Sequence, residues 1–145
     1  MIAAIALVDL DDTLFQTRRK CPPGLDAAAL TPMAFDREGA PLSFATPEQM
    51  RWIDWLRQGT VLVPVTGRSV DALRRVDLAF DLGVAAHGGV ILRQDGVPCP
   101  AWAAHIDAQA KAHDATLREL EQALRASAAA RALDVNVRII GEGET

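Results

Sequence analysis

The feature that most constrains this sequence is an apolar run at its start that leads directly into three carboxylates. Residues 2–8 are all apolar, and Asp9, Asp11 and Asp12 follow at once. Such an apolar run is typical of a buried strand. Carboxylates that lie close together repel one another by roughly 1 kcal/mol per pair even in water. We therefore expect a buried strand over residues 2–8 whose carboxyl end opens into a crevice, where Mg²⁺ would relieve the repulsion.

The next segment predicts a hairpin and then a helix. Short apolar runs on either side of an Asp-Arg-Glu-Gly turn indicate a β-hairpin near residues 32–45, lying as a flap over the end of the first strand. Residues 46–49, Thr-Pro-Glu-Gln, have the pattern of a helix start with a capping box, and Gly59 ends the helix. Trp52 and Trp55 are interpreted as core residues of this helix.

Strand and helix patterns then alternate. We expect buried strands at residues 61–65 and 84–86, a helix over 70–80 between them, and a hairpin over 90–97. This alternation favours right-handed crossovers and a parallel sheet, so the predicted fold class is α/β. Asp9, Thr66 and His87 each follow a predicted strand. Because the carboxyl ends of parallel strands meet at one edge, these residues are expected to face one crevice.

Beyond Pro100 the pattern predicts a long helix and a short strand. The helix covers residues 104–133, and its apolar face carries His113, which is interpreted as a packed histidine. The other residues of this face are Ile106, Ala110, Leu117, Leu120, Leu124 and Ala128. Residues 134–140 alternate as a half-buried strand does. We expect one domain over residues 1–92 and the start of another over 93–145.

The sequence Asp9-Leu-Asp11-Asp12-Thr13-Leu resembles the first motif of the haloacid dehalogenase (HAD) superfamily of phosphotransferases. The sequence Thr66-Gly-Arg resembles the second motif of that superfamily, in the branch with a large cap inserted after the third strand. This branch includes sugar-phosphate phosphatases and phosphomannomutase. The resemblance implies a Rossmann-like parallel sheet, an incomplete HAD core, followed by the beginning of an α+β cap.

The resemblance also implies chemical roles. Asp9 would be the nucleophile that forms an aspartyl phosphate, and Asp11 would be the general acid and then the base. The Asp9 carboxylate and the Asp11 backbone carbonyl would hold Mg²⁺. Thr66 and Gly67 would bind the phosphoryl group, at the N-terminus of the following helix.

Two further residues are candidate substrate contacts. Arg68 either binds substrate or braces its loop through an ion pair, and the sequence favours neither reading. His87 stands where many members of the branch have Asn, and its imidazole can still form a hydrogen bond. Asp12 has no role in the superfamily and is expected to be solvated or to cap a turn.

Two parts of the superfamily pattern have no counterpart. The third motif is a Lys and the fourth an acidic pair, whereas Lys20 and Lys111 are the only lysines and Glu142 and Glu144 stand in a short tail. Positioning and charge neutralisation supply nearly all the catalysis in phosphoryl transfer. We therefore expect the chain to represent the first half of a larger protein and to be inactive, or nearly so, by itself.

The leading hypothesis is a Mg²⁺-dependent phosphatase that acts on a small phosphorylated metabolite, with a sugar phosphate as the expected class. A phosphomutase of the same superfamily and a truncated or degenerate module that binds phosphate without turnover remain alternatives. A receiver domain fits poorly because His87, not Asp, follows the strand at 84–86. A nucleotide-sugar transferase with an Asp-x-Asp site explains neither Thr13 nor residues 66–68.

Charge and cysteine content exclude several other classes. The net charge is −4 and the only basic run is 18–20, so neither a nucleic acid nor an anionic membrane is an expected partner. The N-terminal apolar run is too short for a signal peptide or a membrane span, and we expect a cytoplasmic protein. Cys21 and Cys99 have no zinc-site spacing and are expected to be reduced.

Overall fold

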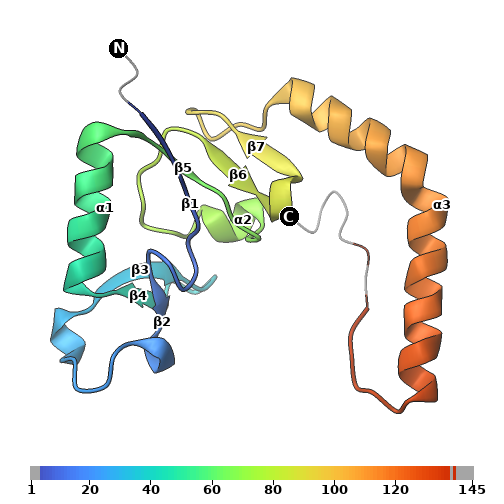
Figure 1. Ribbon diagram of the computed structural model, residues 1–145, viewed down its shortest axis with the longest axis horizontal. Helices are drawn as coiled ribbons and strands as arrows, with labels where there is room; N and C mark the ends of the chain where they lie inside the picture. The colour runs from blue at the N-terminus through green and yellow to red at the C-terminus, as the bar shows by residue number, and fades with distance from the viewer. Residues whose placement is uncertain (1–3, 138, 140–145) are drawn as a thin grey trace. The chain divides into compact units, whose positions relative to one another are not determined.

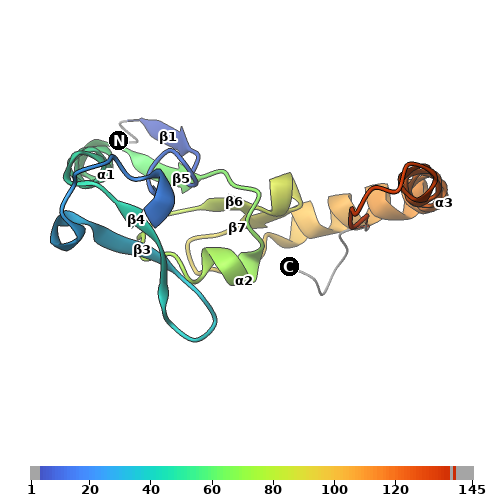
Figure 2. The same ribbon diagram turned by 90° about the horizontal axis from the view of Figure 1, so that it is seen from below.

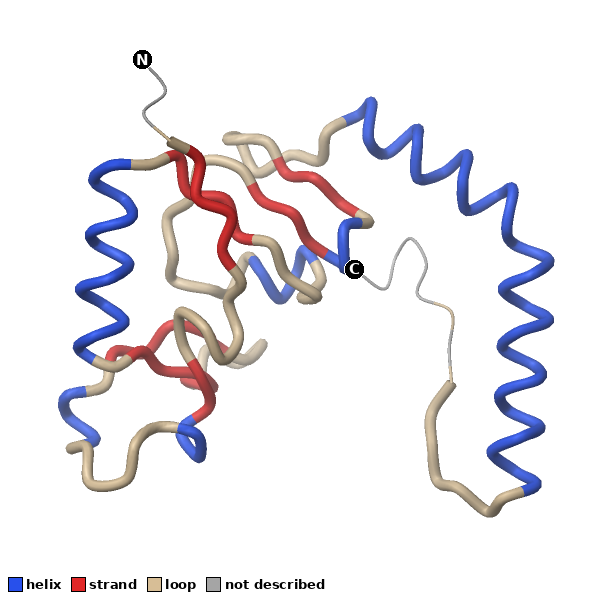
Figure 3. Tube along the Cα trace, in the orientation of Figure 1, coloured by secondary structure: helices blue, strands red, loops and turns tan. Residues whose placement is uncertain are grey.

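The computed structural model describes residues 4–137 and 139 of the 145-residue chain. The described residues form a mixed α/β structure that divides into two compact units, residues 1–99 and 100–145. All labelled strands belong to the first unit, and the second is dominated by α3 (Pro100–Ala130) (Figures 1 and 3). Short 3-10 turns are η1 (Arg18–Lys20), η2 (Ala27–Ala29) and η3 (Ala86–Gly88).

One layer of the first unit carries the predicted parallel strands. Its strands are β1 (Ile5–Val8), β5 (Val61–Pro64), β6 (Gly83–Ala85) and β7 (Val90–Leu92). β1 pairs in parallel with β5, and a parallel bridge between Val65 and Val84 joins β5 to β6. β7 then pairs antiparallel with β6. The strands predicted at 61–65 and 84–86 are therefore confirmed, and Figure 1 shows them following one another across the layer.

The strand predicted over residues 2–8 forms over Ile5–Val8, but it is not buried on both faces. Residues 1–3 lie outside the described part. Val8 packs into the core, whereas Ile5 and Leu7 are 61% and 69% exposed. Successive side chains of a strand point to opposite faces. Because nothing in the described part of the chain buries the second face, the expectation of a fully buried strand was wrong.

The predicted hairpin forms and belongs to a second, antiparallel sheet. Its strands are β3 (Thr31–Phe35) and β4 (Pro41–Ala45), and β2 (Gln16–Thr17) pairs with β4 in the order β2-β4-β3. The Asp36 carboxylate closes the turn by accepting the Glu38 and Ala40 amides at 3.0 and 2.7 Å. Met33 and Ala45 are buried, so the hairpin contributes to the core. Figure 2 shows this sheet beside α1.

The capping box predicted at residues 46–49 starts α1 (Pro47–Gly59) as expected. The Thr46 hydroxyl accepts the Gln49 amide at 3.2 Å, and the Gln49 side chain accepts the Thr46 amide at 2.9 Å. Ile53 forms the centre of the buried face of α1.

Trp52 and Trp55 are 42% and 66% exposed, so their interpretation as core residues was wrong. At 3.6 residues per turn, Trp55 lies nearly opposite Ile53 and Trp52 lies at the margin of the buried stripe. The stripe itself consists of Ile53 and Leu56, and it is too narrow to include either ring.

The helix predicted over residues 70–80 is confirmed only as one turn, α2 (Val70–Leu73). The backbone after it bonds to β3 instead: Phe35 donates to the Arg75 carbonyl at 3.0 Å, and Asp77 donates to the Met33 carbonyl at 2.7 Å. The Arg75 carbonyl and the Asp77 amide, which would continue the helix, thus form hydrogen bonds with β3. Arg75 also donates to Asp71, and this contact lowers the pKa of the Asp71 carboxyl.

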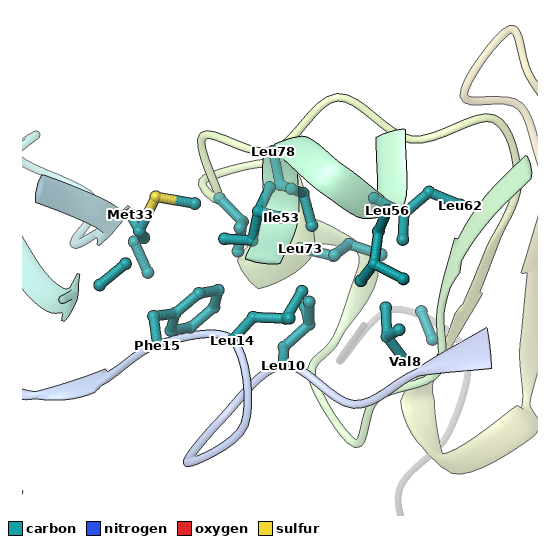
Figure 4. Packing of buried hydrophobic residues seen from close by; sticks show 14 of the residues in the cluster. Val8, Leu10, Leu14, Phe15, Met33, Ile53, Leu56, Leu62, Leu73 and Leu78 are labelled. Atoms are coloured by element: carbon teal, nitrogen blue, oxygen red, sulfur yellow. The ribbon is translucent and has the colours of Figure 1, made fainter. Parts of the chain in front are cut away.

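The core lies beneath the turn that follows β1. Leu10, Leu14 and Phe15 of this turn are completely buried. Figure 4 shows them facing side chains from α1, β5 and α2, namely Ile53, Leu56, Leu62 and Leu73. The acidic segment is therefore anchored by its own apolar residues.

The second unit departs from expectation more than the first. The helix predicted over 104–133 forms as α3, but none of its residues is buried, and His113 is exposed rather than packed. Exposed leucines of its apolar face are Leu117, Leu120 and Leu124. No helix in the described part of the chain is both long and apolar enough to cross a membrane.

The strand predicted over residues 134–140 does not form in its described part. Residues 134–137 and 139 have no regular structure and 134–136 are exposed, while 138 and 140 lie outside the described residues. An alternating pattern produces a strand only where a neighbouring strand supplies hydrogen bonds. The described part of this unit contains no such neighbour.

We expect Leu14→Ala to lower the free energy of unfolding by about 2–5 kcal/mol, because it leaves a cavity in the core beneath the acidic turn. Leu7→Ala, on the exposed face of β1, should change it by no more than about 0.5 kcal/mol. Urea denaturation followed by circular dichroism measures both. Equal losses would contradict the described packing of this turn.

Candidate active site

The loops after β1, β5 and β6 leave the sheet at one edge. The Val65 amide donates to the Val8 carbonyl at 2.7 Å, and the Thr66 amide donates to the Val84 carbonyl at 2.9 Å. The segments that begin with Asp9 and Thr66 therefore start side by side at the carboxyl ends of parallel strands. Ligands of open α/β sheets bind at this kind of edge.

Asp9 is exposed and only partly engaged. The Thr13 hydroxyl donates to its Oδ2 at 3.0 Å, while Oδ1 accepts no hydrogen bond from the described residues. The turn behind it is tight, because the Leu10 carbonyl accepts the amides of residues 13, 14 and 15 at 3.3, 2.9 and 3.3 Å. This turn holds one Asp9 oxygen and leaves the other open to solvent.

Asp11 is paired with Arg68 across the two loops. Arg68 Nε donates to Oδ2 and Nη2 donates to Oδ1, both at 2.7 Å, which is the bidentate geometry of a strong ion pair. The guanidinium carbon also lies 5.3 Å from the centre of the buried Phe15 ring. Of the two readings of Arg68, the structure contains the bracing ion pair.

Thr66 and Gly67 form the floor of the second loop. Thr66 is buried, and its hydroxyl accepts the Arg68 amide at 3.1 Å. A Cβ on Gly67 would come within 2.4 Å of the His87 ring, so a glycine allows this close approach. His87 is exposed and its amide donates to the Thr66 carbonyl at 3.2 Å.

The backbone before and at His87 is unusual. Ala86 and His87 have φ values of 51° and 54°, in the left-handed region that residues other than glycine rarely adopt. Gly88 follows at 93°. Such conformations persist where the surrounding structure holds them in place, and they cluster at functional sites. This turn sets the His87 ring against Gly67.

One predicted element of the site is absent. The phosphate was expected at the N-terminus of a helix over 70–80, but α2 spans only Val70–Leu73. One turn of helix has too few aligned peptides to provide a substantial dipole. The polar groups of this loop include the Thr66 hydroxyl, the Gly67 amide and the Arg68 guanidinium.

The residues present offer two oxygen ligands for a cation. Among the described residues, no group of three or more His, Cys, Asp or Glu side chains could hold a metal. Asp9 Oδ1 is open, however, and the Asp11 carbonyl accepts none of the backbone hydrogen bonds of the turn. One carboxylate and one carbonyl fit Mg²⁺, which usually retains several waters and binds phosphate oxygens.

Gln16 and Gln49 support the site, and sequence reasoning did not assign them to it. Gln49 Nε2 donates to the Thr13 carbonyl at 3.0 Å and to Gln16 Oε1 at 2.7 Å. Gln16 Nε2 in turn donates to the Phe44 carbonyl at 3.0 Å. The capping-box pattern predicts that the side-chain oxygen of Gln49 accepts the Thr46 amide. No local pattern predicts which group its side-chain nitrogen binds.

The two lysines belong to different units of the chain. Lys20 forms an ion pair with Asp12, whose φ is 64°, and Lys111 lies on α3 in the second unit. The structure therefore gives the Asp12 carboxylate a partner of its own.

No protein-family model matches this chain, and a search of curated proteins finds no match either.

We expect Gln49→Glu to lower the free energy of unfolding by about 1–3 kcal/mol at neutral pH. Glutamate keeps the oxygen that caps α1 but cannot donate to the Thr13 carbonyl when ionised. Chemical denaturation measures the loss, and hydrogen exchange of the amides of residues 13–15 should become faster. The control is Gln58→Glu, on the exposed face of the same helix, and a loss as large as that of Gln49→Glu would contradict this role.

Proposed function

We propose that the chain carries the nucleophile of a Mg²⁺-dependent phosphatase of the HAD type. Its substrate would be a small phosphorylated metabolite, with a sugar phosphate as the favoured class. The observation that carries the proposal is the open Oδ1 of Asp9, at the end of β1 and beside the Thr66 loop. In this proposal β1, β5 and β6 are the opening strands of a Rossmann-like HAD core, and the second unit is the start of an α+β cap.

The proposed reaction has two steps. An Asp9 oxygen attacks phosphorus, the bond from phosphorus to the leaving alcohol breaks, and Asp11 gives that oxygen a proton. Asp11 then takes a proton from water as the water attacks the aspartyl phosphate, which releases inorganic phosphate and restores Asp9. Bound Mg²⁺ would supply neutralisation of the charge on the phosphoryl oxygens.

The remaining loop residues have supporting roles in this proposal. The Thr66 hydroxyl and the Gly67 amide would bind the phosphoryl oxygens, since hydroxyl and amide donors suit an anion. Arg68 and His87 would contact the substrate at the edge of the site. The support for these roles is that the backbone amides of Arg68 and His87 both donate to Thr66, at 3.1 and 3.2 Å.

One observation also favours a module that binds phosphate without turnover. Lys20, the one lysine in residues 1–99, is engaged with Asp12. While Lys20 stays with Asp12, an aspartyl phosphate would have Mg²⁺ but no lysine of this unit beside it, and its formation should be slow. Binding and turnover must therefore be measured separately.

Beryllofluoride, which mimics an aspartyl phosphate, tests the nucleophile without requiring turnover. We expect the full chain to show a bound ¹⁹F NMR signal that depends on Mg²⁺, and Asp9→Asn to abolish it because an amide cannot form the carboxylate adduct. Asp12→Asn should retain the signal, since Asn tolerates a positive φ. A signal that survives in Asp9→Asn would refute the nucleophile.

A phosphate-ester assay then separates the two candidate functions. If the chain is an enzyme, we expect it to hydrolyse p-nitrophenyl phosphate in the presence of Mg²⁺. The Asp9→Asn variant should then have no hydrolytic activity. Beryllofluoride binding without any hydrolysis would favour the binding module.

A further inference from the structure

We propose that the Arg68–Asp11 ion pair is a latch, in which the Asp11 carboxylate occupies the Arg68 guanidinium until a phosphoryl anion displaces it. Arg68 is thus a positioning residue for Asp11 as well as an anion ligand. The inference rests on the proposed function and adds to it a mechanism that couples substrate binding to release of the Asp11 side chain.

The hydrogen bonds themselves define the latched state. Both Asp11 oxygens accept from the guanidinium at 2.7 Å, so both are occupied while the pair is intact. Asp11 therefore cannot turn its side chain toward a bound substrate without leaving the Arg68 guanidinium.

The guanidinium is suited to exchanging one anion for another. Its planar fork matches a phosphate as well as a carboxylate, and a substrate phosphoryl group brings more negative charge than Asp11 does. The Asp11 side chain is 49% exposed whereas Arg68 is 18% exposed, so solvent reaches the pair from the carboxylate side. An incoming anion can approach the fork without any rearrangement of the core.

The base of the Arg68 side chain is fixed beside the candidate phosphate loop. Its amide donates to the Thr66 hydroxyl at 3.1 Å, and its carbonyl accepts the Ala86 amide at 2.7 Å. The fully buried Phe15 supports the guanidinium from one face. Transfer of the guanidinium from Asp11 to a bound phosphoryl group therefore requires rotation of side chains only, and it frees the Asp11 side chain.

The latch predicts competition, which tungstate binding can measure. We propose isothermal titration of the full chain with tungstate, a phosphate mimic, in the presence of Mg²⁺. Asp11→Asn should tighten binding by about tenfold, because a neutral amide competes weakly for the guanidinium. In an Arg68→Met background, Asp11→Asn should not increase the affinity for tungstate.

The matched control is Asp12→Asn, which removes an equal charge from the adjacent position and breaks the ion pair with Lys20 instead. It should tighten binding by no more than about twofold, as expected for a screened surface charge. The comparison of Asp11→Asn with Asp12→Asn decides the question even if Arg68→Met does not fold.

Each contrary outcome overturns the latch in a recognisable way. Equal increases of tungstate affinity in Asp11→Asn and Asp12→Asn would mean that only the net charge of the protein determines the affinity. A gain that persists in the Arg68→Met background would mean that Arg68 is not the contested group. Binding that Asp11→Asn leaves unchanged would remove the latch and leave the proposed function standing. Absence of tungstate binding in every variant would remove both.

Discussion

The structure depends on one short turn that is both deeply buried and highly charged. Leu10, Leu14 and Phe15 fill the core, while Asp9 and Asp11, interleaved with them, reach solvent. Burying carboxylates without partners would cost far more than the hydrophobic gain, so the turn must alternate its side chains between core and water. That alternation fixes where β1 ends. It also fixes the direction in which the acids point.

The same turn shows how clustered negative charge is tolerated. Each carboxylate has its own donor: Thr13 for Asp9, Arg68 for Asp11 and Lys20 for Asp12. The sequence suggested that a cation would relieve the repulsion, and the structure shows that side chains from the chain itself already do much of this. The three carboxylates differ in how many of their oxygens remain free to bind another group. Asp9 keeps an open oxygen, whereas both oxygens of Asp11 are engaged.

Local signals predicted local structure well. The capping box at Thr46 and the Asp36 turn formed as expected, because their hydrogen bonds join residues within four positions of one another. Predictions failed where a distant segment decided the outcome. Residues after Leu73 bond to β3 instead of extending α2, and residues 134–137 pair with no strand among the residues that the structure describes.

The sequence by itself determined that three loops of an α/β structure, beginning with Asp9, Thr66 and the residues around His87, follow strands whose ends meet. Strand order and apolar patterning are encoded locally, and parallel pairing brings carboxyl ends to one edge. Only the tertiary structure decided that Arg68 engages Asp11 and that Gln49 holds the Thr13 carbonyl. These contacts join residues 57 and 36 positions apart, and their geometry arises from packing that no local pattern specifies.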